Sequence, residues 1–358
     1  MELKQLNLVN YRNIEKLNIN FSKKFTLIYG DNAQGKTNIL ESIYLFCYLK
    51  SFRQSKNIDL IGKIFNKTSI TSLISHNSID YKYNIKIDKN NKSIYLNDNR
   101  ISNNSFFEYL KCIVYFTDEL NILRNSNSFR KNYIDRGIFL NDYSYLNIVN
   151  KYIYILKSRN LLIKTKQIEN LDVWTDLLID VGTEIRIRRF NYIKEINLLL
   201  EQVYKKIFNN TCYVSIRSED YSAPIEVLKN NFSNSLLNKR NNEINYGKTL
   251  DGPHLDKFDF YIDENNARFY GSQGELRSLL FSIKISQILL YKKIFSKYPL
   301  FLIDDISSEI DNRRLKSLFE FMNNEIGQVI ITSTNKEIMN SDSLKEYINY
   351  KIVDGYIK

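Results

Sequence analysis

The stretch GDNAQGKT at residues 30–37 constrains this chain more than any other part of the sequence. It matches the pattern G-x-x-x-x-G-K-[ST], in which main-chain N–H groups surround a phosphate, the lysine reaches the outer phosphates and the hydroxyl ligates Mg²⁺. An apolar run at residues 25–28 precedes it, and apolar residues at helical spacing follow it. The sequence therefore predicts a strand, a phosphate loop and a helix that bind a nucleotide. The predicted nucleotide-binding residues are Gly30, Asp31, Asn32, Ala33, Gln34, Gly35, Lys36, Thr37 and Asn38.

Composition bounds the class of protein. The 358 residues carry a net charge of +11, which favours a polyanionic partner such as DNA. The whole chain is rich in Lys, Asn, Ile and Tyr, so a general compositional bias explains the surplus equally well. Three scattered cysteines, two histidines and no long apolar run argue against a zinc site, a disulfide framework or a membrane span. We expect a cytoplasmic protein.

Two carboxylates follow an apolar run near the carboxyl end, in the stretch LFLIDD at residues 300–305. In ATPases with a phosphate loop, an acid at this place helps to hold Mg²⁺, and a second acid can orient or deprotonate the attacking water. Asp304 with Thr37 is the predicted metal site, and Asp305 with Lys36 is the predicted catalytic pair. The alternative is a strand followed by an aspartate that caps a helix.

The stretch SQGELR at residues 272–277 predicts the start of a helix, because Ser272 and Glu275 have capping-box spacing. Capping alone would explain it. The serine and glycine also stand about 30 residues before the two carboxylates, as in the signature of ABC-type ATPases, whose helix start binds the γ-phosphate of a second subunit. The residues predicted to act in trans are Ser272, Gln273, Gly274 and Arg277, and those of a dimer loop and γ-phosphate switch are Ser308, Asp311, Thr332 and Thr334.

Strand patterns cover the amino-terminal third of the chain. Residues 3–9 and 14–21 predict two strands, whose turn would bring Arg12 to the nucleotide if the second strand runs beside the phosphate-loop strand. A solvated turn arginine is the alternative. Residues 79–96 predict a hairpin, and residues 112–116 a strand that returns to the sheet.

Helical periodicity dominates the middle of the chain. Residues 146–163 and 178–207 predict two antiparallel helices that form an arm, and the Asn-rich stretch at 230–245 is interpreted as a connection from arm to core. A charge run on a helix is usually a solvated face, which is how we interpret the basic residues of the arm. These are Lys157, Arg159, Arg186, Arg188 and Arg189.

The motifs together resemble the RecF proteins, bacterial recombination mediators of the ABC/SMC ATPase class. The resemblance rests on NYRN at residue 10, GDNAQGKTN, KSFR at residue 50, FRKNYIDR at residue 129, LDVW at residue 171, GPH at residue 252, SQGELR and FLIDDISSEID. It implies an α/β fold: an ABC-type head with a mixed sheet, built from residues 1–117 and 246–358, and an inserted helical arm at 118–245.

The same resemblance implies what the chain does. Such proteins bind ATP and Mg²⁺, dimerise head to head on ATP, bind duplex or gapped DNA, hydrolyse ATP slowly and load RecA together with RecO and RecR. Candidate DNA contacts are Lys50, Arg53, Arg130 and Arg136. Departures from the family pattern stand at Leu255, Glu275 and Asp305, and the last predicts slow turnover because aspartate reaches less far than glutamate.

Two alternatives remain open at this point. One is a RecF-like ATPase from a defence or chromosome-maintenance system. The other, from a different class, is a metabolic kinase or a transporter ATPase, against which the helical insertion and the positive charge both argue.

Overall fold

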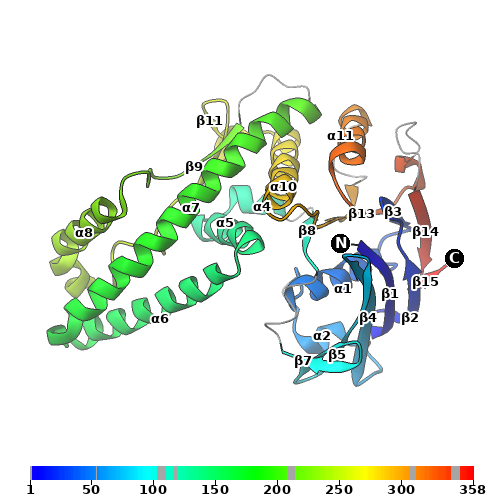
Figure 1. Cartoon of the computed structure of the whole chain (residues 1–358), viewed down its shortest axis with the longest axis horizontal. Helices are drawn as coiled ribbons and strands as arrows, with labels where there is room; N and C mark the ends of the chain where they lie inside the picture. Colours follow the sequence, from blue (N-terminus) through cyan, green and yellow to red (C-terminus); the bar gives the residue numbers. More distant parts are fainter. Residues whose placement is uncertain are drawn as a thin grey trace. The chain divides into compact units, whose positions relative to one another are not determined.

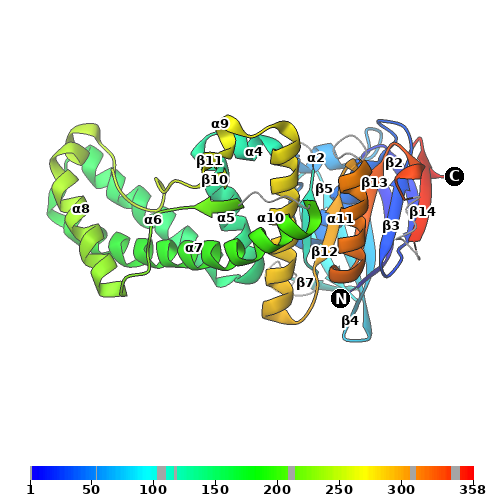
Figure 2. The same cartoon turned by 90° about the horizontal axis from the view of Figure 1, so that it is seen from above.

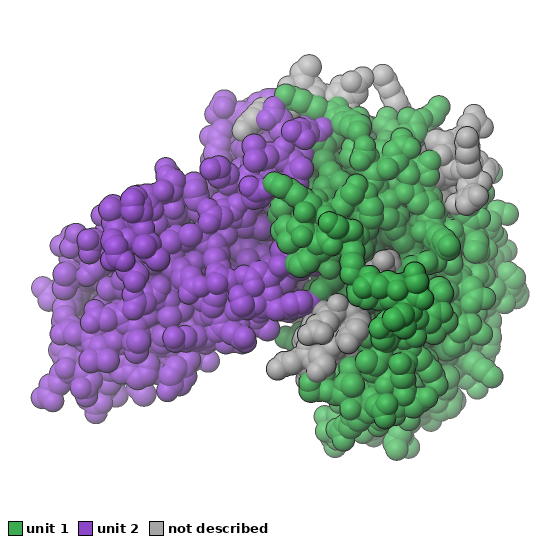
Figure 3. All heavy atoms as spheres, in the orientation of Figure 1, with its two compact units in different colours: residues 1–119, 203–210, 273–358 green, residues 120–202, 211–272 purple. Residues whose placement is uncertain are grey.

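The computed structural model describes residues 2–53, 55–102, 110–116, 119–208, 214–306, 312–339 and 347–358 (Figure 1). The chain forms two compact units, which Figure 3 shows in different colours. The first unit comprises residues 1–119, 203–210 and 273–358, and the second comprises residues 120–202 and 211–272. No helix within the described residues is long and apolar enough to cross a bilayer.

A six-stranded sheet in the order β15-β14-β3-β13-β12-β8 carries the phosphate loop. All its strands are parallel except β15, which pairs antiparallel with β14. The phosphate-loop strand β3 comes from the amino-terminal part of the chain and lies between two strands from the carboxyl-terminal part. The bounds are β3 Phe25–Tyr29, β8 Cys112–Tyr115, β12 Leu300–Ile303, β13 Val329–Ser333, β14 Tyr347–Val353 and β15 Tyr356–Ile357.

Strands β3, β8 and β12 are buried on both faces, as expected for a parallel sheet between layers. Alternate side chains along them, such as Val114 and Leu302, join a hydrophobic core with helix α1 (Lys36–Tyr48). Side chains of opposite orientation meet other helices: the ring of Tyr115 stacks on Phe281 of α10 (Gln273–Phe295), with ring centroids 3.8 Å apart. The phosphate loop is thus fixed between a buried strand and a buried helix.

A second six-stranded sheet, in the order β2-β1-β4-β5-β6-β7, is antiparallel throughout and contributes one face to the same core. The predicted hairpin at residues 79–96 is confirmed as β5 and β6. The strands are β1 Glu2–Tyr11, β2 Ile14–Asn20, β4 Lys67–His76, β5 Ile79–Asp88, β6 Lys92–Leu96 and β7 Asn99–Ile101. The unit is completed by α2 Asn57–Leu60, α11 Asn312–Glu325 and the short 3-10 helix η4 Lys336–Met339.

The second unit is mainly helical and includes a small antiparallel sheet in the order β11-β10-β9. The two predicted arm helices are present as α6 and α7 (Figure 1, Figure 2), and they are antiparallel because Ser144 bonds Arg188 while Arg159 bonds Thr175. Its elements are α4 Leu120–Arg124, α5 Asn127–Asn141, α6 Ser144–Thr165, η2 Ile168–Asn170, α7 Leu171–Phe208, β9 Val214–Arg217, α8 Ile225–Tyr246, β10 Asp259–Ile262, β11 Asn265–Asn266 and α9 Ala267–Tyr270. The last residues of α7, 203–208, belong to the first unit, although the sequence predicts them in the arm.

Three sequence predictions differ from the structure in chain organisation. The Asn-rich stretch at 230–245 is part of α8, whose residues Leu228, Phe232 and Leu236 are buried at helical spacing. Residues 246–272, predicted in the head, lie in the second unit because β10 pairs with β9. Strand β2 does not run beside β3, whose neighbours are β13 and β14, because β2 pairs with β1 in the other sheet.

The expectation of a solvated basic face on the arm is wrong for three of its arginines, which are buried. Arg159 pairs with Glu243 at 2.6 Å. Arg186 and Arg189 share Asp256, and each bonds a second carboxylate, Asp251 for Arg186 and Asp135 for Arg189. Each arginine therefore links helices and loops that are 50 to 90 residues apart in sequence. Lys157 is exposed, as predicted, and Arg188 is partly exposed and pairs with Asp142 and Glu184.

Candidate nucleotide-binding site

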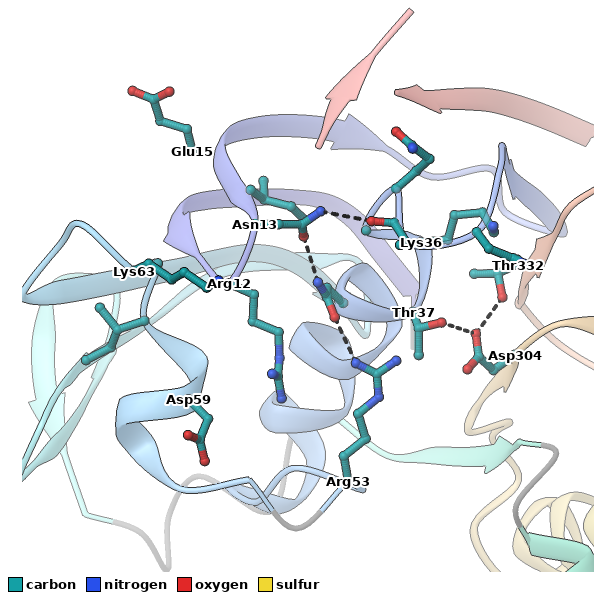
Figure 4. Close-up of a pocket in the computed structure, with 18 of the residues that line it drawn as sticks. Arg12, Asn13, Glu15, Lys36, Thr37, Arg53, Asp59, Lys63, Asp304 and Thr332 are labelled. Atoms are coloured by element: carbon teal, nitrogen blue, oxygen red, sulfur yellow. Dashed lines mark hydrogen bonds between the residues drawn. The ribbon is translucent and has the colours of Figure 1, made fainter. Parts of the chain in front are cut away.

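A pocket of about 810 Å³ lies in the first unit, where the parallel strands β3 and β12 end (Figure 4). Ligands of α/β sheets commonly bind at the carboxyl ends of parallel strands. The pocket brings together the phosphate loop with Lys36 and Thr37, the two acids Asp304 and Asp305, and Thr332 of β13. Residues predicted from three separate motifs, up to about 300 positions apart, therefore line one cavity.

The loop after β3 has the backbone that its glycines permit. Gly30 and Gly35 have φ of 148° and 107°, in the region that favours glycine. A Cβ at Gly30 would overlap the carbonyl oxygen of Ile352, and one at Gly35 would lie 3.0 Å from the side chain of Asn13. Any larger residue would displace the loop from its supports.

Lys36 begins helix α1 and is buried, with 7% of its surface exposed. Its Nζ donates to the carbonyl oxygens of Gly30 and Asp31, both at 2.7 Å. Burial lowers the pKa of Lys36, although the charges of Asp305, Asp304 and Asp31 oppose this shift. The ammonium group and the positive end of the helix dipole therefore meet at the place where a phosphate would sit.

Asp304 is held by two hydroxyl groups. Its Oδ1 accepts hydrogen bonds from Thr332 at 2.7 Å and Thr37 at 2.9 Å (Figure 4). Burial raises the pKa of Asp304, and the hydrogen bonds from Thr332 and Thr37 together with the charge of Arg53 oppose this shift. A carboxylate and a hydroxyl 2.9 Å apart are the hard oxygen donors that Mg²⁺ prefers, so this donor set fits the metal.

Thr332 connects the two acids. The main-chain N–H of Asp305 donates to the Thr332 hydroxyl at 2.9 Å, while the same hydroxyl donates to Asp304. Asp305 has a φ of 53°, an unusual conformation for a residue other than glycine. A change in what Asp304 binds can therefore reach Asp305 through Thr332. Thr334, the other predicted switch residue, is exposed.

Arg12 lines the pocket because its turn, between β1 and β2, lies beside the phosphate loop. Its guanidinium binds Glu41 through two nitrogens and donates to Ser55 at 2.6 Å. Glu41 is fully buried and also accepts from Tyr11 and Ser51. Burial disfavours the charge of Glu41, but the hydrogen bonds from Arg12 and Ser51 outweigh it and lower the pKa of the carboxyl.

The sequence reasoning missed Glu41, although one signal was available: it is an acid inside an otherwise apolar helix directly after the phosphate loop. It also missed Asn13, whose Oδ1 accepts from Asn38 at 2.7 Å (Figure 4). The sequence also does not predict that residues 61–65 form one wall of the pocket, in which the side chain of Ile64 is 86% exposed. An exposed apolar side chain in this wall can pack against the flat base of a nucleotide.

Arg53, predicted as a DNA contact, also lines the pocket. Its Nη1 donates to Asn38 at 2.9 Å, and its charge acts on Asp304 (Figure 4). No carboxylate pairs with it among the described residues. A cation so placed can meet the outer phosphates of a nucleotide.

The other DNA candidates differ in exposure. Arg130 is buried, donates to the carbonyls of Phe258 and Asn125, and lies 3.4 Å from Asp259. This arginine therefore has its partners within the fold, which argues against a role in DNA contact. Lys50 and Arg136 are exposed and stay candidates.

The signature segment, residues 272–277, begins helix α10 as predicted. Ser272 and Gln273 are exposed, whereas Arg314 of α11 lies over Gly274, where a Cβ would approach its guanidinium to 3.3 Å. The side chain of Arg314 thus partly covers the helix start at Gly274. The described residues that line the pocket include none of this segment, and neither Ser308 nor Asp311 lies within the described residues.

The sheet, the phosphate loop and the paired acids define an ABC-type P-loop ATPase head. The chain matches the family model "RecF/RecN/SMC N terminal domain" over residues 2–354. It is 32% identical to the DNA replication and repair protein RecF of Geotalea uraniireducens, with both chains covered in full. The chain therefore belongs to the RecF/RecN/SMC N-terminal domain family, and within it to the RecF group.

Solved structures agree with this assignment. The recombination mediator RecF bound to ATP, a member of the RecFOR pathway, aligns with a TM-score of 0.86 at 26% identity, covering 100% of this chain and 98% of that one. An Smc head bound to the C-winged helix domain of ScpA aligns with a TM-score of 0.60 at 15% identity, covering 100% and 96%. The latter likeness concerns the fold alone.

Proposed function

We propose that the chain is an ATP-dependent DNA-binding protein of replication and repair, whose slow ATPase works as a switch. One observation carries the proposal: Thr37, Asp304 and Thr332 form a bonded cluster beside the buried Lys36. A protein that only stored a nucleotide would need the phosphate loop but not the paired acids. The name of its relatives, DNA replication and repair protein RecF, supports DNA as the molecule that it binds. A cytoplasmic location accords with this role.

The residues divide the chemistry as follows. Lys36 and the N–H groups of the loop hold the outer phosphates of ATP. Thr37 and Asp304 would hold Mg²⁺, which when bound neutralises charge on the β- and γ-phosphates. Asp305 orients the attacking water or accepts its proton. Loss of the γ-phosphate is sensed at Asp304 and Thr332: the Thr332 hydroxyl donates to Asp304 and accepts from the main-chain N–H of Asp305.

Dimerisation on ATP is the second part of the proposal. The signature residues Ser272 and Gln273 are exposed, and none of that segment lines the pocket of its own chain. An exposed helix start can instead bind the γ-phosphate held by a second copy of the chain. The nucleotide would then stabilise a dimer, and hydrolysis would release it.

DNA is the proposed partner because the relatives are DNA replication and repair proteins, and the net charge of +11 accords with a polyanionic partner. Affinity should fall steeply with salt, since each phosphate contact releases bound counterions. The resemblance to RecF proteins adds two further parts to the proposal. The protein acts together with RecO-type and RecR-type partners, and it helps to load RecA at gaps. Lys50 and Arg136 are the exposed candidates for DNA contact.

Fluorescence anisotropy of a labelled gapped duplex tests the proposal. Binding is measured without nucleotide, with ADP and with ATP plus Mg²⁺. We expect tight binding with ATP only, and its loss in Lys36→Ala. Equal binding in all three states would contradict the switch, and a flat salt response would remove the electrostatic argument.

A further inference from the structure

The turn between β14 and β15, Asp354–Gly355, is hydrogen-bonded to the phosphate loop. The N–H of Gly355 donates to the carbonyl oxygen of Gln34 at 3.1 Å. The N–H of Asp354 donates to the side-chain oxygen of the same Gln34. One loop residue is therefore bound through both its main chain and its side chain by a segment about 320 positions away.

The contact leaves no spare room. Gly355 is buried with a φ of 81°, and a Cβ there would lie 2.7 Å from the carbonyl oxygen of Asn13. At the other end of the phosphate loop, Gly30 lies directly on the carbonyl of Ile352, which precedes the turn. Tyr356, which follows the turn, donates its hydroxyl to Glu15 at 2.9 Å. The turn thus connects the phosphate loop with the turn of the first hairpin.

We propose that the Asp354–Gly355 turn is a positioning element for nucleotide binding, which holds the phosphate loop in its binding conformation. The inference rests on the proposed ATP-binding function. Phosphate loops bind through main-chain N–H groups, so their affinity depends on how little the backbone must be ordered when the ligand arrives. Gln34 lies in the middle of that backbone, and the turn fixes it before any ligand is present.

The proposal separates binding from catalysis. The loop holds the phosphates that ADP and ATP share, so a loosened turn should weaken both nucleotides equally. The hydrogen bonds that hold Asp304 and Thr332 run to Thr37, to each other and to the N–H of Asp305 rather than to the turn, so turnover at saturating ATP should stay the same. A defect in γ-phosphate sensing would behave differently, because it would affect ATP alone.

The main experiment compares two glycine variants of the full chain. Gly355→Ala places a Cβ against Asn13, whereas Gly247→Ala, at the end of α8, has a similar φ of 69° and a Cβ only in ordinary contact with Lys164. Binding of ADP and ATP is measured by titration calorimetry, and kcat is measured at saturating ATP.

We expect Gly355→Ala to raise the Kd of both nucleotides about tenfold, which corresponds to about 1.4 kcal/mol, while kcat changes less than about twofold. Gly247→Ala should leave both Kd values unchanged. An unchanged Kd in Gly355→Ala, or a loss confined to kcat, would overturn the inference. If the unmodified chain itself binds no nucleotide, the proposed function fails instead.

A second measurement needs no variant. If the turn favours nucleotide binding, the nucleotide must stabilise the turn by the same free energy. Hydrogen exchange of the amides of Asp354 and Gly355 should therefore slow when ADP is added, because both amides bond Gln34. Unchanged exchange at these two amides, with ADP demonstrably bound, would contradict the proposal even if Gly355→Ala does not fold.

Discussion

The nucleotide pocket of the first unit and the arginine cluster of the second both bury charge, but they satisfy it differently. In the cluster, Arg159, Arg186 and Arg189 each bond at least one carboxylate. In the pocket, Arg12 also has a carboxylate partner, Glu41, but the two residues proposed to meet phosphate and metal do not. Lys36 bonds two carbonyl oxygens and Asp304 bonds two hydroxyl groups. A buried charge that is paired with an opposite charge stabilises the fold. A buried charge whose hydrogen-bond partners are all neutral can still pair with a charged ligand.

The pKa values of one carboxyl group in each region shift in opposite directions, in line with this contrast. Burial raises the pKa of Asp304 in the pocket, because its two hydroxyl partners offset only part of the cost. In the cluster, burial also disfavours ionisation of Asp251, but hydrogen bonds from Ser235 and Arg186 outweigh it and lower the pKa. The buried carboxylate of Asp304 therefore lowers the stability of the free protein, and a bound ligand can offset this loss. The carboxylate of Asp251 in the cluster causes no such loss.

The largest change in the free energy of unfolding is expected where a buried ion pair is broken. Arg189→Ala leaves Asp135 and Asp256 short of a partner, and should lower the free energy of unfolding by about 3–5 kcal/mol. Urea denaturation followed by circular dichroism measures this, with the exposed Lys157→Ala as control. ATP affinity of the folded protein should not change. A loss below about 1 kcal/mol would place the pair in the range of surface ion pairs and break the comparison.

Lys36→Ala should give the reverse pattern. Removing this cation costs ATP binding about 2–5 kcal/mol, because a phosphate then lacks its buried partner, while unfolding changes little. Lys24→Ala is a matched control, since Lys24 also donates to a carbonyl, that of Ile326, and its pKa is lowered by burial. Titration calorimetry with ATP should separate the two. Equal losses in both variants would show a general effect of removing a lysine.

Asp304→Asn should separate stability from activity. The raised pKa means that this group stabilises the fold fully below its unfolded pKa of about 3.9, and that this contribution is lost as the pH rises through the folded value. The variant should therefore melt at a higher temperature than the unmodified chain near pH 7 without nucleotide, and the difference should vanish toward pH 4. Thermal scans over this pH range measure it.

The same substitution removes a proposed metal ligand. Loss of turnover with Mg²⁺ should exceed roughly a hundredfold, the upper range for residues that only support a ligand. A variant that is less stable at pH 7, or that retains turnover, would show that Asp304 has a structural role.

Asp305→Glu should have the smallest effect. The longer side chain should raise single-turnover hydrolysis about tenfold, a fraction of the roughly 10²–10⁴ that general bases contribute. The positive φ at this position suits glutamate less well than aspartate, which limits the gain. Rapid-quench measurement of ATP cleavage tests this. No gain would argue against reach as the cause of slow turnover.

Local patterns predicted the parts of the fold that local chemistry dictates. The phosphate loop, the strand that ends at Asp304 and the helix that starts after Ser272 all lie where periodicity and motif place them. These features depend on glycine conformations, alternation and helix starts, all of which act over a few residues. The long helices of the arm follow for the same reason.

Partners distant in sequence could not be predicted in this way. The charge of Arg189 is the same in sequence whether it faces water or Asp135, 54 positions away. The sequence makes Arg53 a candidate DNA contact, but only tertiary contacts show that it reaches Asn38 and lines the nucleotide pocket. Composition predicts a connecting segment at residues 230–245, although buried apolar residues at helical spacing make this stretch part of α8.

The strand order also determines when, during translation, the phosphate-loop strand can first pair with its neighbours in the sheet. Strand β3 ends at Tyr29, but its neighbours β13 and β14 begin at Val329 and Tyr347. At 5–20 residues per second, a ribosome needs roughly 15–60 s to make the intervening stretch. During that time the apolar strand that leads into the phosphate loop has no partner in its sheet. A nascent chain therefore cannot bind its nucleotide until translation is almost complete, and it depends on protection from aggregation until then.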